Sequence, residues 1–264
     1  MNALLSSPGR GRILAIASGK GGVGKTWFAI SLAHCLSVRH APTLLFDADL
    51  GLANVDIQLG LMPDYDLSAV LGGRSTLEGA CVRHEGGFDI LAGRSGSGEL
   101  AGMDRLTQDR VQQLLLRAAA RYENVIVDLG AGLDPFVRDV AALADILLVV
   151  ATDEPTSLTD AYAVLKLHQR DTAPRMPRSR IVINQATSRG SGEKTYAALA
   201  RACQSFLGHT PPLAGIIRRD EKVRDAIRRQ TLLAIRHPTT AACEDVNELV
   251  VRLASSIPAP YDHA

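Results

Sequence analysis

Residues 12–26 of this 264-residue chain read RILAIASGKGGVGKT, and this stretch decides the fold. Residues 12–18 are an apolar run that predicts a short β-strand, and a glycine-rich loop follows directly. A helix with an apolar inner side is predicted over residues 26–38. A glycine loop between a strand and a helix can hold phosphate with its backbone N–H groups and the positive end of the helix dipole.

The loop itself is a complete Walker A pattern, Gly19-x₄-Gly24-Lys25-Thr26. We expect Lys25 to reach the β- and γ-phosphates of a bound nucleotide, and the Thr26 hydroxyl to ligate Mg²⁺. The expected nucleotide-binding residues of the loop are Gly19, Gly21, Gly22, Val23, Gly24, Lys25, Thr26 and Trp27. The pattern therefore predicts a nucleoside triphosphate site with magnesium.

A rival interpretation uses the same glycines. Gly19-x-Gly21-x-x-Gly24 also fits the dinucleotide fingerprint, and Asp47 follows the second predicted strand as the ribose-binding carboxylate of that fold would. The Lys25-Thr26 pair decides between the two, because a dinucleotide loop lacks it and a triphosphate site needs it. NAD binding stays the weaker alternative.

The remainder of the chain alternates apolar runs with amphipathic segments. Strands are predicted over residues 43–47, 88–91, 124–129, 146–151, 181–184 and 213–217, and helices over 107–121, 135–143, 157–169, 194–207, 223–229 and 240–257. Continuously apolar strands are typical of a parallel sheet that is buried on both faces. We therefore predict an α/β fold of the P-loop NTPase type, with a mostly parallel twisted sheet and helices on both faces. A single domain is expected over residues 1–264, with a core of about 12–257, a mobile loop at 93–102 and a disordered tail at 258–264.

The composition argues against several other classes of protein. A net charge of +1 gives no general attraction to nucleic acid or acidic lipid. The four cysteines are scattered without a C-x-x-C pair, which favours buried reduced thiols over a disulfide framework or a closed zinc site. Residues 1–10 lack the apolar run of a signal peptide, and the chain has no uncharged stretch near the ~20 residues of a membrane span. We expect a cytoplasmic protein.

Four polar residues stand at or near the ends of predicted strands. Asp47 and Asp49 lie two residues apart at one strand end, so both are expected to face the nucleotide. Asp128 ends the apolar strand 124–129 in a Walker B arrangement, which would bring one carboxylate to the magnesium. Asn184 ends a further strand, and its amide could pair with the edge of a base.

The full octapeptide, with the additional Lys20, resembles the deviant Walker A of the MinD/ParA ATPases. The resemblance implies ATP as the nucleotide and a dimer that forms face to face around two ATP molecules, with Lys20 reaching the partner's phosphates. It also implies that Asp49 orients the attacking water and that Asp47 supports the hydration shell of the metal. Asn184 would bind adenine, and the segment 217–220, with Arg219, would close over the base.

The resemblance therefore completes the expected site. The catalytic residues would be Lys20, Lys25, Asp49 and Asp128, and the magnesium residues Thr26, Asp47 and Asp128. Relatives usually have a small polar residue after the Walker B aspartate, where this chain has Leu129. The loop Gly130-Ala131-Gly132 resembles switch II of the family.

Residues 47–56 (DADLGLANVD) and 153–166 (DEPTSLTDAYAVLK) resemble the flagellar number regulators of the FlhG/FleN branch. This branch implies an ATPase switch that helps to set flagellar number or placement. Its implied partners are the SRP-type GTPase FlhF and flagellar switch or transcription proteins, with recruitment to the cell pole or the inner membrane surface. Many members carry a glutamine-containing activator motif near the N-terminus, and residues 1–10 contain no glutamine.

Two surface segments leave alternatives open. Val246, Leu249, Val250, Leu253 and Ile257 form an apolar stripe, but Arg252 is the one basic residue beside it, which favours packing on the domain over membrane binding. Residues 218–236 are rich in arginine and would suit a DNA-binding partition ATPase of the ParA type, although a solvated helix face is favoured. A division-site ATPase of the MinD type is the other alternative. Iron–sulfur carriers of this fold need paired cysteines, which the sequence lacks.

Overall fold

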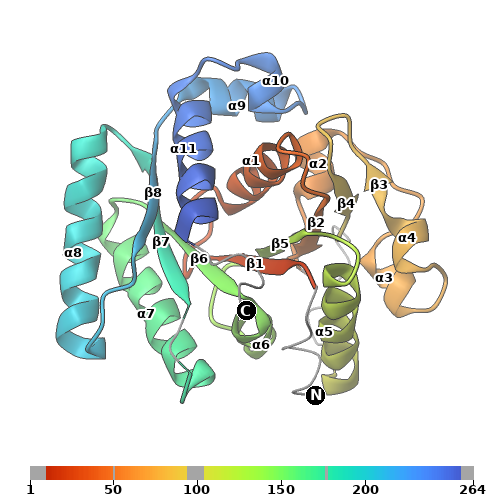
Figure 1. Cartoon of the computed structure of the whole chain (residues 1–264), viewed down its shortest axis with the longest axis horizontal. Helices are drawn as coiled ribbons and strands as arrows, with labels where there is room; N and C mark the ends of the chain where they lie inside the picture. The colour runs from red at the N-terminus through yellow and green to blue at the C-terminus, as the bar shows by residue number, and fades with distance from the viewer. Residues whose placement is uncertain (1–9, 50, 94–103, 176–177, 257–264) are drawn as a thin grey trace, which may run out of the picture.

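An eight-stranded sheet forms the centre of the protein (Figure 1). The computed structural model describes residues 10–49, 51–93, 104–175 and 178–256. The strand order is β3-β4-β2-β5-β1-β6-β7-β8, and all neighbours run parallel except β3 and β4. The strands are β1 (Arg12–Ala17), β2 (Thr43–Ala48), β3 (Val82–Arg83), β4 (Asp89–Leu91), β5 (Asn124–Leu129), β6 (Ile146–Ala151), β7 (Ser179–Ala186) and β8 (Leu213–Arg218).

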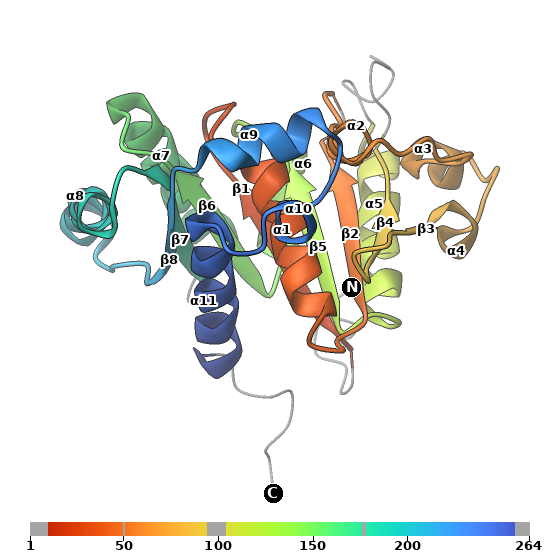
Figure 2. The same ribbon diagram turned by 90° about the horizontal axis from the view of Figure 1, so that it is seen from above.

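Helices cover both faces of the sheet (Figures 1 and 2). One layer contains α1 (Lys25–Ser37), α2 (Val55–Leu59), α9 (Glu221–Arg228), α10 (Leu233–Arg236) and α11 (Ala241–Ser256). The other contains α5 (Arg105–Ala119), α6 (Pro135–Leu143), α7 (Pro155–Thr172) and α8 (Arg189–Leu207). The short helices α3 (Leu67–Leu71) and α4 (Leu77–Ala80) pack on this second layer.

Each central strand supplies side chains to both layers. In β1, Ile13 and Ala15 pack with α5 and α6, whereas Leu14 and Ile16 pack with α1 and α11. The alternation follows from the period of two along a strand, and burial on both faces explains why these strands are apolar throughout. The predicted mostly parallel sheet between two helical layers is confirmed.

The last helix packs on its own domain, as the sequence analysis favoured. Val246, Leu249, Val250 and Leu253 of α11 are buried against β8 and α1. The thiols of Cys35, Cys203 and Cys243 are buried and unpaired, while that of Cys81 is half-buried. Among the described residues, no helix is both long and apolar enough to cross a bilayer. Ile257 and the expected mobile loop and tail lie outside the described residues, apart from Gly93.

The sheet is extended from β1 in both directions, and this switch point positions the functional site. β1 lies parallel between β5 and β6; the chain first continues from β1 to β2 on the β5 side and later from β6 to β7 on the other side. Ligands of open α/β sheets bind outside the carboxyl ends of the strands at such a switch point. The loops after β1, β2 and β5 meet at this edge.

A matched pair of substitutions in α5 tests this packing. Leu115 is fully buried, whereas Leu106 on the same helix is 59% exposed. Leu115→Ala should lower the free energy of unfolding by about 2–5 kcal/mol, because it removes buried methyl groups and leaves a cavity. Leu106→Ala should change it by less than about 0.5 kcal/mol. Urea unfolding of both variants measures the difference, and equal losses would contradict the assigned faces of α5.

Candidate nucleotide site

The glycine loop has a backbone shape that needs glycine. Gly22 and Gly24 have positive φ angles of 78° and 91°, and Gly24 precedes the first residue of α1. A Cβ atom on Gly24 would lie 2.5 Å from the amide nitrogen of Asn184. The loop is therefore closed against the end of β7, with the N–H groups of the first turn of α1 free to bind an anion.

Asn184 holds this loop from β7, two strands away from β1 in the sheet. Its buried amide nitrogen donates to the Val23 carbonyl at 2.7 Å, and its oxygen accepts the N–H of Gln185 at 2.9 Å. The pairing of β7 with β8 is irregular between Ile183 and Ala186, where Gln185 has a φ of 58°. The structure thus places Asn184 beside the loop, with its side chain bonded to backbone. Adenine binding by this residue stays a prediction.

Lys25 is buried at the bottom of the loop. Its ammonium group donates to the Ser18 hydroxyl at 3.0 Å, and this hydroxyl donates to the Lys20 carbonyl at 2.6 Å. Burial lowers the pKa of Lys25, while the carboxylates of Asp128 and Asp49 oppose that shift. A desolvated ammonium group next to N–H donors is suited to a phosphate. Sequence reasoning missed the supporting role of Ser18, since nothing in the motif specifies it.

Asp128, the next-to-last residue of β5, lies beside Thr26, which supports their prediction as the magnesium residues. The Thr26 hydroxyl donates to the Asp128 carboxylate, which is only 1% exposed. Burial raises the pKa of Asp128 to about 7, opposed by the bond from Thr26 and by Lys25. Within the described part of the chain, Oδ1 of Asp128 has no hydrogen-bond partner. A buried carboxylate oxygen without a partner fits a hydrated Mg²⁺, which would offer it a donor and a positive charge.

Asp47 is occupied by the backbone of the segment that follows it. Its oxygens accept the N–H groups of Asp49, Asn54 and Val55, each at 3.1 Å. Burial raises the pKa of Asp47 to about 8, and the nearby Asp128 adds to the shift. Asp47 lies outside the lining of the cavity described next. The contacts show a residue that shapes the loop after β2, and its role in metal hydration stays a prediction.

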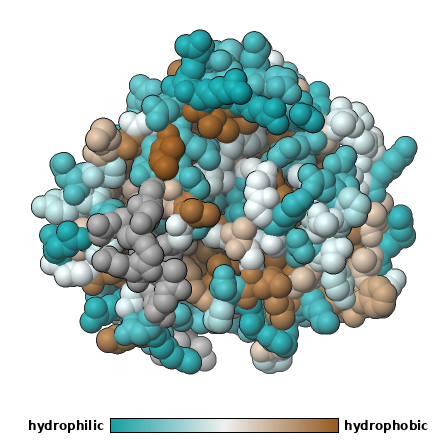
Figure 3. Space-filling model, turned by 180° about the vertical axis from the view of Figure 1, so that it is seen from behind, coloured by the Kyte–Doolittle hydropathy of each residue, from teal (hydrophilic) through white to brown (hydrophobic). Residues whose placement is uncertain are grey.

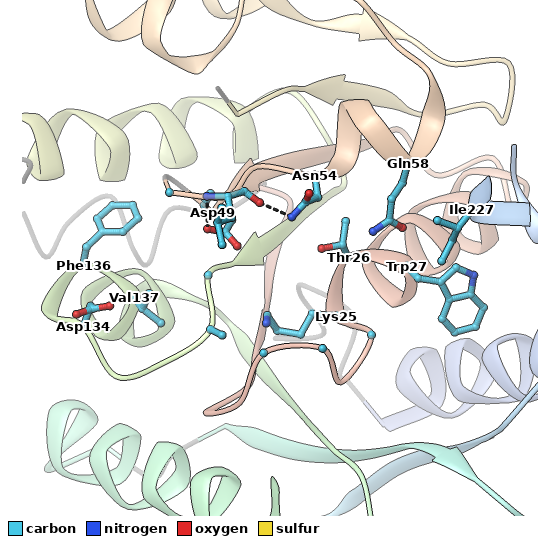
Figure 4. A pocket seen from close by; sticks show the side chains of 18 of the residues that line it. Lys25, Thr26, Trp27, Asp49, Asn54, Gln58, Asp134, Phe136, Val137 and Ile227 are labelled. Atoms are coloured by element: carbon cyan, nitrogen blue, oxygen red, sulfur yellow. Dashed lines mark hydrogen bonds between the residues drawn. The ribbon is translucent and has the colours of Figure 1, made fainter. Parts of the chain in front are cut away.

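A cavity of about 680 Å³ opens over the glycine loop (Figure 4). Asp49 lines it next to Gly130, whose Cα would place a Cβ 3.2 Å from the Asp49 carboxylate. Asn54 donates to the carbonyl of Leu52 in the same segment. Another part of the wall comes from the loop after β5 and the start of α6, with Asp134 and Phe136 among its residues. Of the two carboxylates predicted to face the nucleotide, Asp47 and Asp49, it is therefore Asp49 that faces the cavity.

Lys20 points away from the cavity of its own chain. Its ammonium group is bonded to the carboxylate of Glu154 and donates to the Thr156 hydroxyl at 3.2 Å, both at the start of α7. Lys20 is not among the residues that line the cavity, in contrast to Gly21, Gly22 and Lys25. Glu154 and Thr156 belong to the segment 153–166, and nothing in the sequence pattern connects that segment to Lys20.

The opposite end of the cavity contains three side chains that the sequence analysis did not bring together (Figure 4). Trp27 of α1, Gln58 of α2 and Ile227 of α9 meet there. Trp27 is expected at the site from its place directly after Thr26, and the structure shows that this residue is buried, with 6% of its surface exposed. No local pattern identifies Gln58 or Ile227, because they reach the cavity through the packing of α2 and α9 over α1.

Arg219 lies beyond the described cavity lining, at the start of the segment before α9. Its backbone N–H donates to the Ala186 carbonyl at 2.8 Å, and its guanidinium forms an exposed ion pair with Glu221 at 3.7 Å. The preceding Arg218 binds the buried carboxylate of Asp245 through its backbone N–H and its guanidinium. The predicted closure of this segment over a base therefore remains a prediction.

The arginine-rich segment is partly neutralised by its own acidic neighbours. Arg229 and Arg236 both pair with Asp225, and Arg218 pairs with Asp245 and Glu244. Seen from behind, the top of the molecule, where α9 lies, is hydrophilic, and hydrophobic patches lie below it (Figure 3). The ion pairs agree with the favoured interpretation of a solvated helix face.

Comparison with known proteins agrees with this geometry. The profile of the CobQ/CobB/MinD/ParA nucleotide binding domain matches residues 14–233. The antiactivator FleN of Pseudomonas aeruginosa is 37% identical over 232 residues, which cover 88% of this chain and 82% of FleN. The flagellum site-determining protein YlxH of Helicobacter pylori is 25% identical, with 97% and 86% coverage. Septum site-determining MinD of Pyrococcus horikoshii, solved with Mg-ADP, superimposes with a TM-score of 0.78 at 20% identity, covering 96% of this chain and 99% of MinD.

The one tryptophan of the chain offers a direct test of the cavity. Because the Trp27 ring lines it, filling the cavity should change the polarity around the indole. Titration with Mg²⁺ and ATP is expected to give a saturable change in emission excited at 295 nm. Trp27→Phe should abolish the signal. Calorimetric binding of ATP without any change in wild-type emission would show that the nucleotide binds away from Trp27.

Proposed function

Since the chain belongs to the CobQ/CobB/MinD/ParA family of nucleotide-binding proteins, we propose that it is an ATPase switch that regulates the number or placement of flagella. The supporting observation is the Lys25, Thr26 and Asp128 cluster under a glycine loop, in a chain 37% identical to FleN. Slow hydrolysis would end the active state of such a switch.

ATP is the nucleotide that the site is proposed to bind. The loop from Gly19 to Thr26 would hold the phosphates, with Lys25 on the β- and γ-phosphates. Thr26 and Asp128 would hold Mg²⁺, with Asp47 behind them. When bound, the metal ion supplies positive charge that stabilises the transferring phosphoryl group. The buried Oδ1 of Asp128, which has no hydrogen-bond partner among the residues that the structure describes, supports this assignment.

Asp49 is proposed to act on the attacking water. It is half-buried at the cavity wall, and its carboxylate accepts the exposed N–H of Leu52 at 3.1 Å. A carboxylate with free lone pairs can orient a water molecule by hydrogen bonding. Asp47 is less suited to this step, because three backbone N–H groups occupy its oxygens.

Dimerisation is proposed to complete the site. Lys20 does not line its own cavity and is held on an exposed surface by Glu154 and Thr156. An exposed ion pair of this kind contributes about 0–1 kcal/mol, so exchanging it for a phosphate on a second chain costs little. Lys20 would thereby add positive charge at the partner's γ-phosphate, and the ATP-bound dimer would be the active state.

Flagellar partners are the finer part of the proposal. FleN and YlxH are named as an antiactivator and a flagellum site-determining protein, which favours the flagellar role. By this likeness, FlhF and flagellar switch or transcription proteins are candidate partners, at the cell pole or the inner membrane surface. Membrane binding through the described part of α11 is not favoured, because its apolar stripe is buried. A ParA-type partition role with DNA binding, or a MinD-type division role, is the alternative.

The dimer is tested by two substitutions with opposite expected effects. With ATP and Mg²⁺, Asp49→Ala should bind nucleotide and accumulate as a dimer, because hydrolysis no longer ends the state. Lys20→Ala should bind ATP yet remain a monomer. Light scattering after size exclusion measures the mass of both. Monomeric wild type and monomeric Asp49→Ala under saturating ATP would contradict the proposed switch.

The flagellar role is tested in cells that lack this protein. Electron microscopy should show an altered number or position of flagella, and the wild-type gene should restore it. Asp49→Ala, which is expected to trap the active state, should give the opposite phenotype to the deletion. Normal flagella together with unequal segregation of plasmids or misplaced septa would support the partition or division alternative instead.

A further inference from the structure

Ser18, the residue between β1 and the glycine loop, is buried next to Lys25 at the nucleotide site. It is 1% exposed and is not among the residues that line the cavity. A buried hydroxyl group needs hydrogen-bond partners. The partners of Ser18 are the ammonium group of Lys25 and the carbonyl group of Lys20. The hydroxyl therefore connects the lysine of this site with the backbone of the lysine that faces outward.

The direction of both hydrogen bonds is fixed by the chemistry of the partners. Oγ of Ser18 carries a single proton, and the Lys20 carbonyl oxygen, 2.6 Å away, can only accept it. The ammonium group of Lys25 can only donate, so its bond of 3.0 Å uses a lone pair of the hydroxyl oxygen. Rotation of the hydroxyl would break one of the two bonds. The Lys20 carbonyl thus orients Ser18, and Ser18 in turn orients Lys25.

Two further elements fix the backbone around Ser18. Its carbonyl oxygen accepts the N–H of Gly132 at 3.0 Å, from the loop after β5. Gly132 has a φ of 112°, a backbone conformation that favours glycine. On the other side, a Cβ atom on Gly19 would lie 2.6 Å from the carbonyl oxygen of Asp160, so α7 packs directly on the residue after Ser18. The position of Ser18 therefore depends on the packing of the whole site as well as on the glycine loop.

Lys25 needs an orienting partner because carboxylates surround it. Asp128 and Asp49 attract its ammonium group through space, whereas its hydrogen bond goes to Ser18. Lysine has a flexible four-carbon stem and three N–H donors. Without Ser18 as acceptor, the ammonium group would turn toward the Asp128 carboxylate, which is a stronger acceptor than a hydroxyl. With one donor on Ser18, two N–H groups are left for the β- and γ-phosphates.

We propose that Ser18 is a positioning residue of the ATPase reaction, and that it acts through Lys25. Its hydroxyl holds the ammonium group in the direction in which it meets the phosphoryl group during transfer, when preorganised positive charge is most effective. Loss of the hydroxyl leaves the charge of Lys25 in the site but removes its defined placement. This inference rests on the proposed assignment of Lys25 to the phosphates.

Ser18→Ala tests the role of the hydroxyl. The kcat of ATP hydrolysis should fall by about tenfold or more, since a hydrogen bond to a charged group is lost in the transition state. The KM for ATP should change by less than about threefold, because the charge that binds the phosphates is retained. Isothermal titration calorimetry should likewise give an ATP Kd within about threefold of wild type, independently of turnover.

Two other substitutions separate the hydroxyl from the volume of the side chain. Ser18→Thr keeps the hydroxyl and should restore kcat to within about threefold of wild type. Ser18→Cys keeps nearly the same volume, but a thiol is a weak hydrogen-bonding group, so this variant should be as slow as Ser18→Ala.

Ser37→Ala is the matched control, because the hydroxyl of Ser37 at the far end of α1 contacts the carbonyl groups of His34 and Gly86. It should leave kcat unchanged.

The kcat values of the variants decide the inference. Wild-type kcat in Ser18→Ala or in Ser18→Cys would overturn it. A raised KM together with a lowered melting temperature in Ser18→Ala would also overturn it, since Ser18 would then serve the stability of the fold alone. If Ser18→Thr does not fold by circular dichroism, Ser18→Cys decides, because it keeps the volume and loses the strong acceptor. Absence of ATP binding by wild type would contradict the proposed function itself, whereas wild-type turnover with an unaffected Ser18→Ala contradicts only the role of Ser18.

Discussion

The burial of opposite charges at one edge of the sheet is the constraint on which the structure depends. Lys25 and Asp128 are withdrawn from water under the glycine loop, with Asp47 next to them. Burial lowers the pKa of the lysine and raises the pKa of Asp128, because leaving water disfavours the charged form of each group. The two buried groups stabilise each other because they attract one another. In addition, Ser18 accepts a hydrogen bond from Lys25, and Thr26 donates one to Asp128. A triphosphate with Mg²⁺ would complete the charge balance.

Asp47 and Asp49, two neighbouring carboxylates at the end of β2, have different contacts and different positions. Asp47 accepts three backbone N–H groups and so fixes the course of the segment after β2. Asp49, two residues later, then faces the cavity at a defined place beside Gly130. Lys20 is directed outward from the same glycine loop that buries Lys25. One loop thus presents one lysine to its own site and one to the surface, which is the arrangement expected of a site that a second chain completes.

The central part of the fold and of the site could be predicted from the sequence because the signals there are local. The strand at residues 124–129 and the helix at 135–143 have the predicted bounds, since each combines an apolar pattern with a clear boundary. Short elements such as α3 and α4 were missed, because helices of four or five residues show no period and are identified by the cap contacts of Asp66 and Thr76. Gln58 and Ile227 were missed because tertiary packing alone brings them to the cavity. The Lys20–Glu154 contact joins residues 134 positions apart, which no spacing rule connects.

Isothermal titration calorimetry of ATP with Mg²⁺ tests the central assignment most directly, when wild type is compared with Lys25→Ala. Wild type should bind one nucleotide per chain. Lys25→Ala should bind at least about tenfold more weakly, since a charge-assisted hydrogen bond contributes about 1.5–3 kcal/mol and 1.4 kcal/mol corresponds to a factor of ten. A folded Lys25→Ala variant that binds ATP as tightly as wild type would contradict the assignment of the buried lysine to the phosphate site.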